Sequence, residues 1–269
     1  MLLTGGAHPW TQAPAPEGQQ TLEQRFAPPP GYRRIEQSQG SFGAWLRTLP
    51  VKAGRPDVLL HTGERKGNQS AHAAVLDIDV GKRDLQQCAD ASMRLRAEYL
   101  WSVRRSEDVC FRAAAGYDVP WTKWRRGLRP PAKRGEQWRK SAGPSRSYKA
   151  FRRYLDKVFG VANTASIARQ VVHVDAADVR AGDIFLERAS GGYFGHAVTV
   201  MDVVEDASGQ RRFLLSQSYM PAQQMHILAG VGDATGPWYA APAPGKRFAT
   251  PEWTFPPDSL RRFKESGCR

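Results

Sequence analysis

The feature that most constrains the fold is the run of residues 196–204, HAVTVMDVV, in which both alternating sets of side chains are mostly apolar. A strand of this kind needs a packed layer on each face, so it belongs in the interior of a sheet. A turn at Gly191 and Gly192 precedes the run, residues 206–210 form a hairpin loop, and residues 211–218 return as an antiparallel partner. The sequence therefore predicts a central antiparallel hairpin.

Other elements are predicted from apolar spacing and from turn residues. Helices are expected over residues 41–49, with Pro50 as the stop, over residues 147–159 and, more briefly, over residues 164–171. Strands are expected over residues 58–61, 71–80 and 184–186. The fold class is therefore α+β, with an antiparallel sheet packed with helices.

The clearest helix is expected to follow residue 84. Asp84 is a good N-cap residue and Gln87 falls at the N3 position, which gives the spacing of a capping box. Apolar side chains then recur at intervals of four as far as Leu100. Cys88 is therefore expected in the first turn of a helix, where the backbone N–H groups favour a thiolate.

The distribution of proline divides the chain into two unequal parts. Residues 1–30 are predicted to be a flexible, proline-rich tail, and residues 31–265 a single α+β domain. Within that domain, a basic and aromatic-rich insertion is expected at about residues 117–153. No run of about 20 apolar residues predicts a transmembrane segment. The first residues also do not have the pattern of a secretory signal, which leaves the location open.

The positive charge is concentrated in one window. The chain has 39 Lys and Arg against 26 Asp and Glu, and residues 121–153 hold twelve of the basic residues and one acidic residue. Six aromatic residues between positions 121 and 154 alternate with these charges. The pattern predicts binding to an anionic polymer, and its aromatic and basic alternation also fits nucleic acid. The alternative is a solvated basic face whose aromatic rings belong to the core.

Three residues meet the requirements of a cysteine nucleophile and its base. Cys88 is placed at a helix start, and His196 opens the central strand, where its imidazole can reach a cleft. If the hairpin turns near residue 208, Gln217 returns beside His196 and can orient its ring. Asp202 shares the strand face of His196 but lies about 20 Å along it. The predicted catalytic residues are Cys88, His196 and Gln217; the alternative is a buried, unreactive Cys88.

Further polar residues around this centre are predicted to bind substrate, namely Gln87, Arg94, Glu98 and Tyr219. Asp90, Arg94 and Glu98 are spaced for i,i+4 ion pairs on a helix. For that stripe, a salt-bridge ladder on the helix surface is favoured over a role in substrate binding.

No metal or other cofactor is predicted. His72, Asp77 and Asp79 include types that bind metals, but strand alternation places the two aspartates on one face and the histidine on the other. Of the three cysteines, Cys110 and Cys268 are interpreted as structural or incidental. One disulfide is compatible with an oxidising compartment and would leave one free thiol.

The order of these parts resembles the papain-like superfamily, in particular the NlpC-type cell-wall amidases and related lipid-modifying hydrolases. Residues 181–185 read AGDIF and residues 195–200 read GHAVTV, as in the glycine–aspartate turn and histidine strand of that superfamily. The resemblance implies that Cys88 attacks an amide or ester carbonyl, His196 acts as base and then acid, and Gln217 orients His196. Gln87 or a backbone N–H would stabilise the oxyanion. A long insertion between helix and turn departs from the compact members.

Across most of residues 25–263 the chain also resembles a bacterial domain family of unknown function. The stretches that carry this resemblance include DIDV at 77–80, QQCAD at 86–90, QSYMPAQ at 217–223 and PEWTF at 251–255. It implies one domain rather than two. Because members resemble envelope proteins of bacteria, it also implies a periplasmic or secreted location.

These patterns predict a papain-like cysteine hydrolase, an amidase or peptidase that acts on a cell-wall peptide of the peptidoglycan type or a similar amide. The alternative from a different class is a non-catalytic binding module that uses the basic aromatic face on nucleic acid or an anionic glycan. The enzyme requires Cys88 to be accessible in a groove beside His196, and a buried Cys88 would contradict it. The binding module requires only the exposed basic face.

Overall fold

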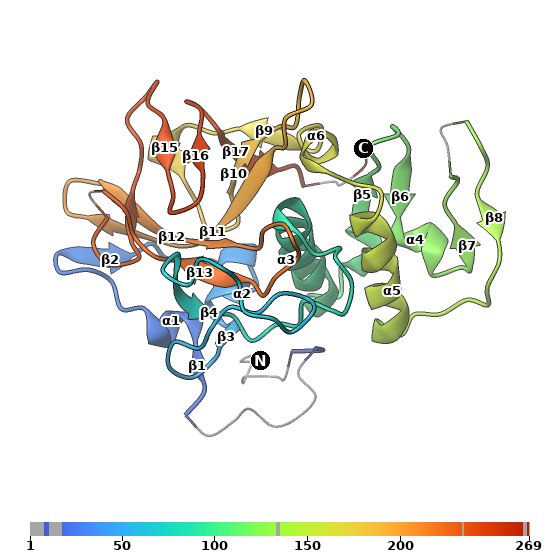
Figure 1. Cartoon of the computed structure of the whole chain (residues 1–269), viewed down its shortest axis with the longest axis horizontal. Coiled ribbons are helices and arrows are strands. Elements are labelled where there is room, and N and C mark those ends of the chain that lie inside the picture. Colours follow the sequence, from blue (N-terminus) through green and yellow to red (C-terminus); the bar gives the residue numbers. More distant parts are fainter. Residues whose placement is uncertain (1–7, 11–17, 133–134, 233, 266–267, 269) are drawn as a thin grey trace.

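The computed structural model describes residues 8–10, 18–132, 135–232, 234–265 and 268. Its centre is the predicted antiparallel hairpin of β11 (His196–Asp206) and β12 (Arg211–Gln217) (Figure 1). The main sheet has the order β4-β13-β12-β11-β10-β17-β9, where the added strands are β4 (His72–Val75), β13 (His226–Leu228), β10 (Ile184–Glu187), β17 (Leu260–Phe263) and β9 (Val171–His173). β2 (Tyr32–Arg34) also pairs with β11, and β14 (Tyr239–Ala240) with β12. Every pairing is antiparallel, which confirms the predicted α+β class.

The remaining elements are short, apart from two helices. The other strands are β1 (Gln20–Thr21), β3 (Pro50–Val51), β5 (Cys110–Arg112), β6 (Asp118–Pro120), β7 (Leu128–Arg129), β8 (Arg139–Lys140), β15 (Phe248–Ala249) and β16 (Thr254–Phe255). The helices are α1 (Leu22–Arg25), α2 (Phe42–Arg47), α3 (Cys88–Ser102), α4 (Trp121–Trp124), α5 (Tyr148–Phe159) and α6 (Thr164–Ile167), with 3₁₀ turns at Ser106–Asp108 and Ala176–Asp178.

The two faces of β11 pack against different hydrophobic clusters, which explains why both of its residue sets are apolar. Ala197 and Met201 belong to the cluster that includes the buried side chains of α3. Val198 and Val200 belong to a second cluster, with Phe213 of β12. A hydrogen bond of 2.8 Å between the hydroxyls of Ser92 on α3 and Thr199 identifies the first face as the one covered by α3.

Helix α3 begins at Cys88, four residues after the predicted N-cap, so the prediction of Asp84 as N-cap was wrong. Gln87 is the N-cap, and Asp90 at N3 accepts a hydrogen bond from the backbone N–H of Gln87. The Asp84 carboxylate instead accepts the backbone N–H of Ala222 at 2.7 Å, so a tertiary contact uses the group that would have capped the helix. As a result Cys88 is the first residue of the helix.

Helices α2 and α5 begin one residue after Ser41 and Ser147, the predicted starts, and each serine is the N-cap. Ser41 accepts a hydrogen bond from the N–H of Ala44, and Ser147 accepts one from the N–H of Ala150. The predicted strand at residues 71–80 is shorter, because β4 ends at Val75. Residues 58–61 form isolated bridges rather than a strand.

The folded part of the chain begins before residue 31, which corrects the predicted boundary of the tail. Strand β1 pairs with β3, and Thr21 caps α1 with a capping box. Leu22 is completely buried in the main hydrophobic cluster. Residues 1–7 and 11–17 of the predicted tail lie outside the described residues.

The predicted insertion packs into the same core as the sheet. In Figure 1, α4, α5 and the hairpins β5–β6 and β7–β8 form one end of the molecule, with α3 between them and the main sheet. Trp121, Phe151 and Tyr154 are buried there and belong to the cluster of α3. Within the described residues no helix is long and apolar enough to cross a membrane.

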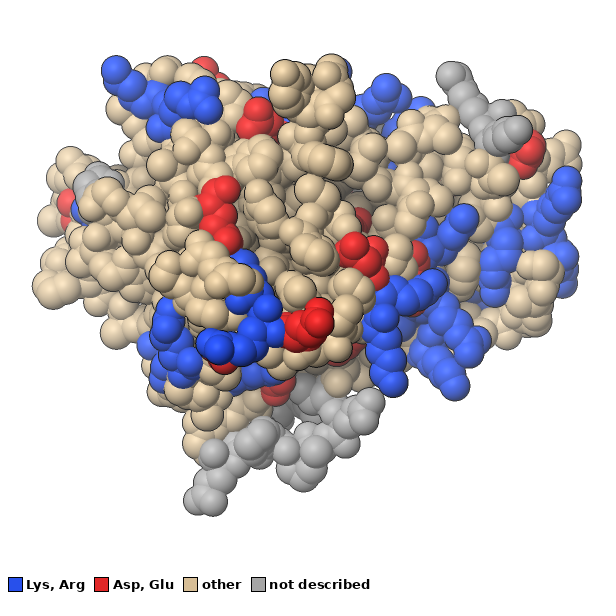
Figure 2. Space-filling view, viewed as in Figure 1, with Lys and Arg blue, Asp and Glu red and all other residues tan. Residues whose placement is uncertain are grey.

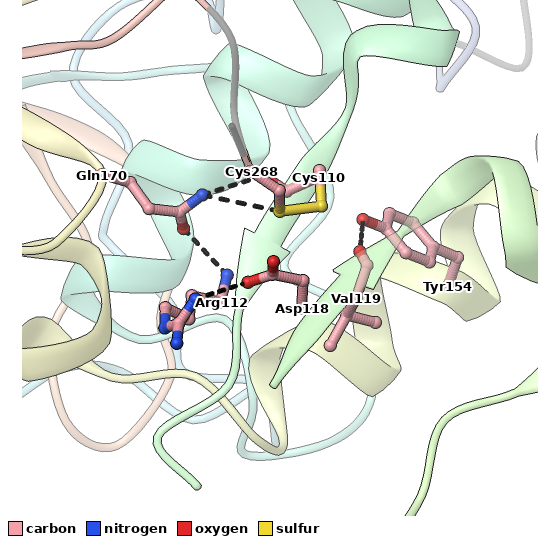
Figure 3. Close-up of a disulfide and its surroundings, with 7 residues drawn as sticks. All are labelled: Cys110, Arg112, Asp118, Val119, Tyr154, Gln170 and Cys268. Atoms are coloured by element: carbon pink, nitrogen blue, oxygen red, sulfur yellow. Dashed lines mark hydrogen bonds and ion pairs between the residues drawn. A yellow bond between two sulfur atoms is a disulfide. The ribbon is translucent and has the colours of Figure 1, made fainter. Parts of the chain in front are cut away.

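A disulfide between Cys110 and Cys268 joins β5 to the C-terminal segment (Figure 3). Gln170 supports it, because its side-chain amide donates to the carbonyl oxygen of Cys110 at 3.1 Å and accepts the N–H of Arg112 at 2.8 Å. Beside it, the Tyr154 hydroxyl donates to the carbonyl oxygen of Val119. With both partners bonded, Cys88 is the free cysteine.

Candidate functional site

The Cys88 thiol lies against the backbone on both sides of His196. Its Sγ is 4.0 Å from the carbonyl oxygen of Gly195, and the N–H of Ala197 donates to the sulfur. The side chain is 6% exposed. Burial, with a smaller contribution from the charge of Asp90, raises the pKa of the Cys88 thiol to about 11. Cys88 is therefore buried rather than accessible in a groove, which corrects that expectation, and its thiol is protonated at neutral pH.

His196 is enclosed by aromatic rings. Its ring centroid lies 4.8 Å from that of Tyr219, 5.0 Å from that of Trp253 and 5.7 Å from that of Phe255. Burial lowers the pKa of the imidazole to about 4, and the hydrogen bond to Gln217 opposes this only in part. His196 is therefore a neutral imidazole at neutral pH.

Gln217 lies beside His196, where the hairpin register was predicted to bring it. Its Oε1 is 3.1 Å from Nε2 of His196, and its Nε2 donates to the carboxylate of Glu252 at 2.6 Å. The same Gln217 nitrogen is 3.3 Å from Nε2 of His226, and Lys66 forms an ion pair of 2.6 Å with Glu252. The structure thus joins three buried side chains, His196, Gln217 and His226, to a charged pair.

The Cys88 thiol and the His196 ring lie on different faces of the start of β11. Ala197 faces α3 and Cys88, whereas the His196 ring contacts Phe255 of the second hydrophobic cluster. Among the described residues, no hydrogen bond joins the thiol to the imidazole. Tyr219 borders both groups: its ring contacts His196, and burial, the charge of Glu252 and then that of Cys88 raise the pKa of its hydroxyl.

Two of the predicted substrate-binding residues are enclosed, which corrects that prediction. Arg94 is 0% exposed and Glu98 is 1% exposed, so neither is available to a substrate. Their predicted i,i+4 ion pair is present at 3.4 Å, but it is buried rather than on the helix surface. Arg94 donates to Asp79 and to Gln86, each at 2.6 Å, and Tyr148 donates to Glu98 at 2.7 Å. The physical reason is that α3 is covered on both sides, with twelve of its 15 residues buried.

The other two predicted substrate-binding residues lie at the surface of the site. Gln87 is partly buried and its amide donates to the carboxylate of Asp84 at 2.9 Å. Tyr219 is also partly buried, beside His196. Directly before His196, the side chains of Tyr193 and Phe194 are 82% and 71% exposed.

Glu252, Lys66 and His226 were missed by the sequence reasoning. Each comes from a different segment, and Lys66 and Glu252 are 186 positions apart. The one available signal is the PEWTF stretch at 251–255, which supplies Glu252 together with Trp253 and Phe255, two of the rings around His196.

A polar pocket of about 200 Å³ lies beside the segment that leads into α3. Its charged lining includes Asp79, Lys82, Arg83, Arg152 and Asp156, and ion pairs link Arg83 to Asp156 and Arg152 to Asp79. Among the described residues, no group of three or more His, Cys, Asp or Glu side chains is placed to hold a metal ion.

The basic window forms an exposed surface at the end of the molecule that contains α5 and β8. Figure 2 shows Lys and Arg side chains gathered there. The exposed basic residues of this surface, which none of the described carboxylates pairs, are Lys123, Arg126, Arg139, Lys140, Arg146, Lys149 and Arg153. We call these seven residues the basic surface.

The aromatic residues of the window do not lie on the basic surface as base-stacking platforms, which corrects that reading of the pattern. Trp121, Trp124, Phe151 and Tyr154 are buried. Of the other two, Tyr148 donates to Glu98, and Trp138 is partly buried with Lys123 over its ring. The physical reason is that α4 and α5 direct their rings into the core.

No curated protein and no solved structure matches the chain. The family model that matches covers residues 22–262, which is nearly all of the described chain. The chain belongs to the family described as Domain of unknown function (4846).

Proposed function

We propose that the protein is a cysteine-dependent hydrolase, an amidase or peptidase of the papain-like, NlpC type. Cys88 is the nucleophile, His196 the general base and acid, and Gln217 the residue that orients His196. The observation that carries the proposal is the position of the one free thiol at the start of a helix, in contact with the backbone on both sides of a histidine held by an amide.

The reaction starts from a neutral pair, because the thiol has a pKa of about 11 and the imidazole one of about 4. As the sulfur of Cys88 forms its bond to the substrate carbonyl carbon, His196 takes the thiol proton. This transfer requires the two side chains to move together, because no hydrogen bond joins them at rest. The imidazolium then gives that proton to the leaving amine as the C–N bond breaks, which leaves a thioester on Cys88. Water, deprotonated by His196, hydrolyses the thioester and restores the thiol. First-turn N–H groups of α3 are the candidate oxyanion donors.

Substrate entry requires movement at the segment before His196, because Cys88 is 6% exposed at rest. Tyr193 and Phe194 lie on that segment and are the large hydrophobic side chains most exposed among the described residues. In the proposal they contact the substrate beside the scissile bond, together with Tyr219.

The substrate class that we propose is a cell-wall peptide of the peptidoglycan type. The resemblance to NlpC-type amidases supports this class. The disulfide between Cys110 and Cys268 supports an oxidising location outside the cytoplasm, where such substrates occur. The basic surface would hold an anionic wall near the site.

The test is digestion of purified bacterial sacculi, followed by mass spectrometry of the soluble peptides and a measurement of new amino groups. Wild-type protein is expected to release peptides, and Cys88→Ser and His196→Ala are expected to release none. Lys246→Gln, a change of an exposed lysine outside the basic surface, is the control that should retain activity. Release that persists in Cys88→Ser, or no release by folded wild-type protein, would contradict the proposal.

The second candidate is a module that binds an anionic polymer through the basic surface. It is favoured by seven exposed basic residues that no described carboxylate neutralises. Since the neighbouring rings are buried, binding should depend on charge rather than on base stacking. Fluorescence anisotropy with labelled single-stranded DNA, duplex DNA and an anionic glycan should show similar affinities that fall steeply with salt. A strong preference for the single strand would contradict this reading.

A further inference from the structure

We propose that Glu252 is a positioning residue: it fixes the orientation of the Gln217 amide, and through it the tautomer of His196, so that Nδ1 is the ring nitrogen left to accept a proton. This inference deepens the proposed function, because it identifies which atom of His196 would act as the base. The inference rests on a series of hydrogen bonds from Glu252 through Gln217 to His196, in which each contact determines the donor and acceptor of the next.

The first step concerns the Gln217 amide. An ionised carboxylate only accepts hydrogen bonds, so the Gln217 atom that lies 2.6 Å from the Glu252 carboxylate is the NH₂ group. The other amide atom, the oxygen, then faces Nε2 of His196 at 3.1 Å. Glu252 thus decides between two orientations of the amide that are nearly identical in shape.

The second step concerns His196. An amide oxygen only accepts, so Nε2 of His196 carries the hydrogen. A neutral imidazole has one N–H, and burial keeps this ring neutral by lowering its pKa to about 4. Nδ1 is therefore left with its lone pair, as a general base requires.

The hydrogen bonds of His226 independently require the same orientation of the Gln217 amide. Its Nδ1 lies 2.9 Å from the carbonyl oxygen of Gln224, so Nδ1 is the donor and Nε2 is an acceptor in the neutral ring. That acceptor lies 3.3 Å from Gln217, which must present its NH₂ group there as well. Burial lowers the pKa of His226 to about 3, which keeps the ring neutral.

Lys66 forms the ion pair that holds the Glu252 side chain in place. It is 7% exposed, and its ammonium donates to Glu252 at 2.6 Å and to the carbonyl oxygen of Asn68 at 3.0 Å. The Glu252 side chain is 15% exposed, so the ion pair replaces much of the water that its carboxylate would otherwise contact. Lys66 and Glu252 therefore act on His196 through Gln217, without contact with the reacting atoms.

The test is a ¹H–¹⁵N spectrum of histidine-labelled protein at pH 7, recorded so that each ring nitrogen is correlated with the carbon-bound ring protons. Wild-type His196 is expected as one tautomer, with hydrogen on Nε2 and none on Nδ1. Hydrogen on Nδ1 in wild-type protein would overturn the proposal, and this result needs no variant that might fail to fold.

Variants then test Glu252 itself. Glu252→Leu removes the acceptor, and a measurable fraction of His196 should then carry its hydrogen on Nδ1. Glu64→Leu, which removes an exposed glutamate of the loop that contains Lys66, should leave the spectrum of His196 as in wild type. An unchanged tautomer in folded Glu252→Leu would show that Glu252 does not position the ring. Since the spectrum requires no substrate, its outcome is separate from the digestion of sacculi.

Discussion

Alkylation of the single free thiol tests the electrostatics of the site directly. The perturbation is iodoacetamide, added to non-reduced protein over a range of pH from 7 to 11. Because Cys110 and Cys268 are bonded to each other, the alkyl group can enter only at Cys88. Intact mass spectrometry of quenched samples therefore gives the rate at one site.

The expected magnitude follows from the raised pKa of Cys88. A thiol with the ordinary pKa of 9.0 is roughly 10% thiolate at pH 8, whereas one with a pKa of about 11 is roughly 0.1% thiolate. Folded protein should thus react about 100-fold more slowly at pH 8 than the same protein unfolded in guanidinium. Low exposure slows the reaction further, but it does not change the pH at which the rate levels off.

The pH dependence of the alkylation rate shows whether the pKa of the Cys88 thiol is raised. The rate should rise about tenfold for each pH unit and level off only near pH 11. In Asp90→Asn, which removes the nearby charge but not the burial, the rate should rise only modestly, since burial is the larger cause. A rate that levels off below pH 8 would refute the reasoning, because it would require a thiolate paired with an imidazolium in the resting protein.

Two further predictions concern stability. His196 and His226 have pKa values lowered from 6.5 to about 4 and about 3, so the unfolded chain binds more protons and stability should fall as the pH falls from 6.5 towards 4. For His196 alone the loss is on the order of 3 kcal/mol at pH 4, measurable as a lower urea midpoint than at pH 7; equal midpoints would refute buried, neutral rings. Replacement of Cys110 and Cys268 by serine opens a loop of 158 residues, for which the chain-entropy relation gives a loss of about 5 kcal/mol as an upper value. A urea midpoint that does not move would show that the unfolded state does not gain freedom when the bond is absent.

The sequence predicts best those elements whose signals are local. The nearly continuous apolar run of residues 196–204 predicts a strand buried on both faces, and β11 does lie between two hydrophobic clusters. Ser41 and Ser147 stand at the predicted helix starts, and each accepts the N–H of the residue three positions on, so a local contact sets where α2 and α5 begin. The hairpin loop returns Gln217 towards His196, and a bulge between Val200 and Asp202 shifts the register by one residue before the two side chains meet.

The predictions that failed depend on contacts from distant segments. Asp84 has the properties of an N-cap, but its carboxylate accepts a hydrogen bond from the backbone N–H of Ala222 instead. The i,i+4 spacing of Arg94 and Glu98 is the same on an exposed helix and on a buried one, so only the surrounding layers reveal that both are enclosed. Nothing near Lys66 or Glu252 in the sequence indicates that the two meet, and therefore the charged pair behind Gln217 was not predicted.

The place of β17 in the main sheet has a consequence for synthesis of the chain. This strand leaves the ribosome after the other strands of the sheet, yet it lies between β10 and β9. Until it arrives, a nascent chain presents the open edge of β10 and an unpaired β9, which are templates for association with other chains. We therefore expect protein truncated before Leu260 to aggregate or to be held by chaperones, even though the Cys88 and His196 segments would be complete.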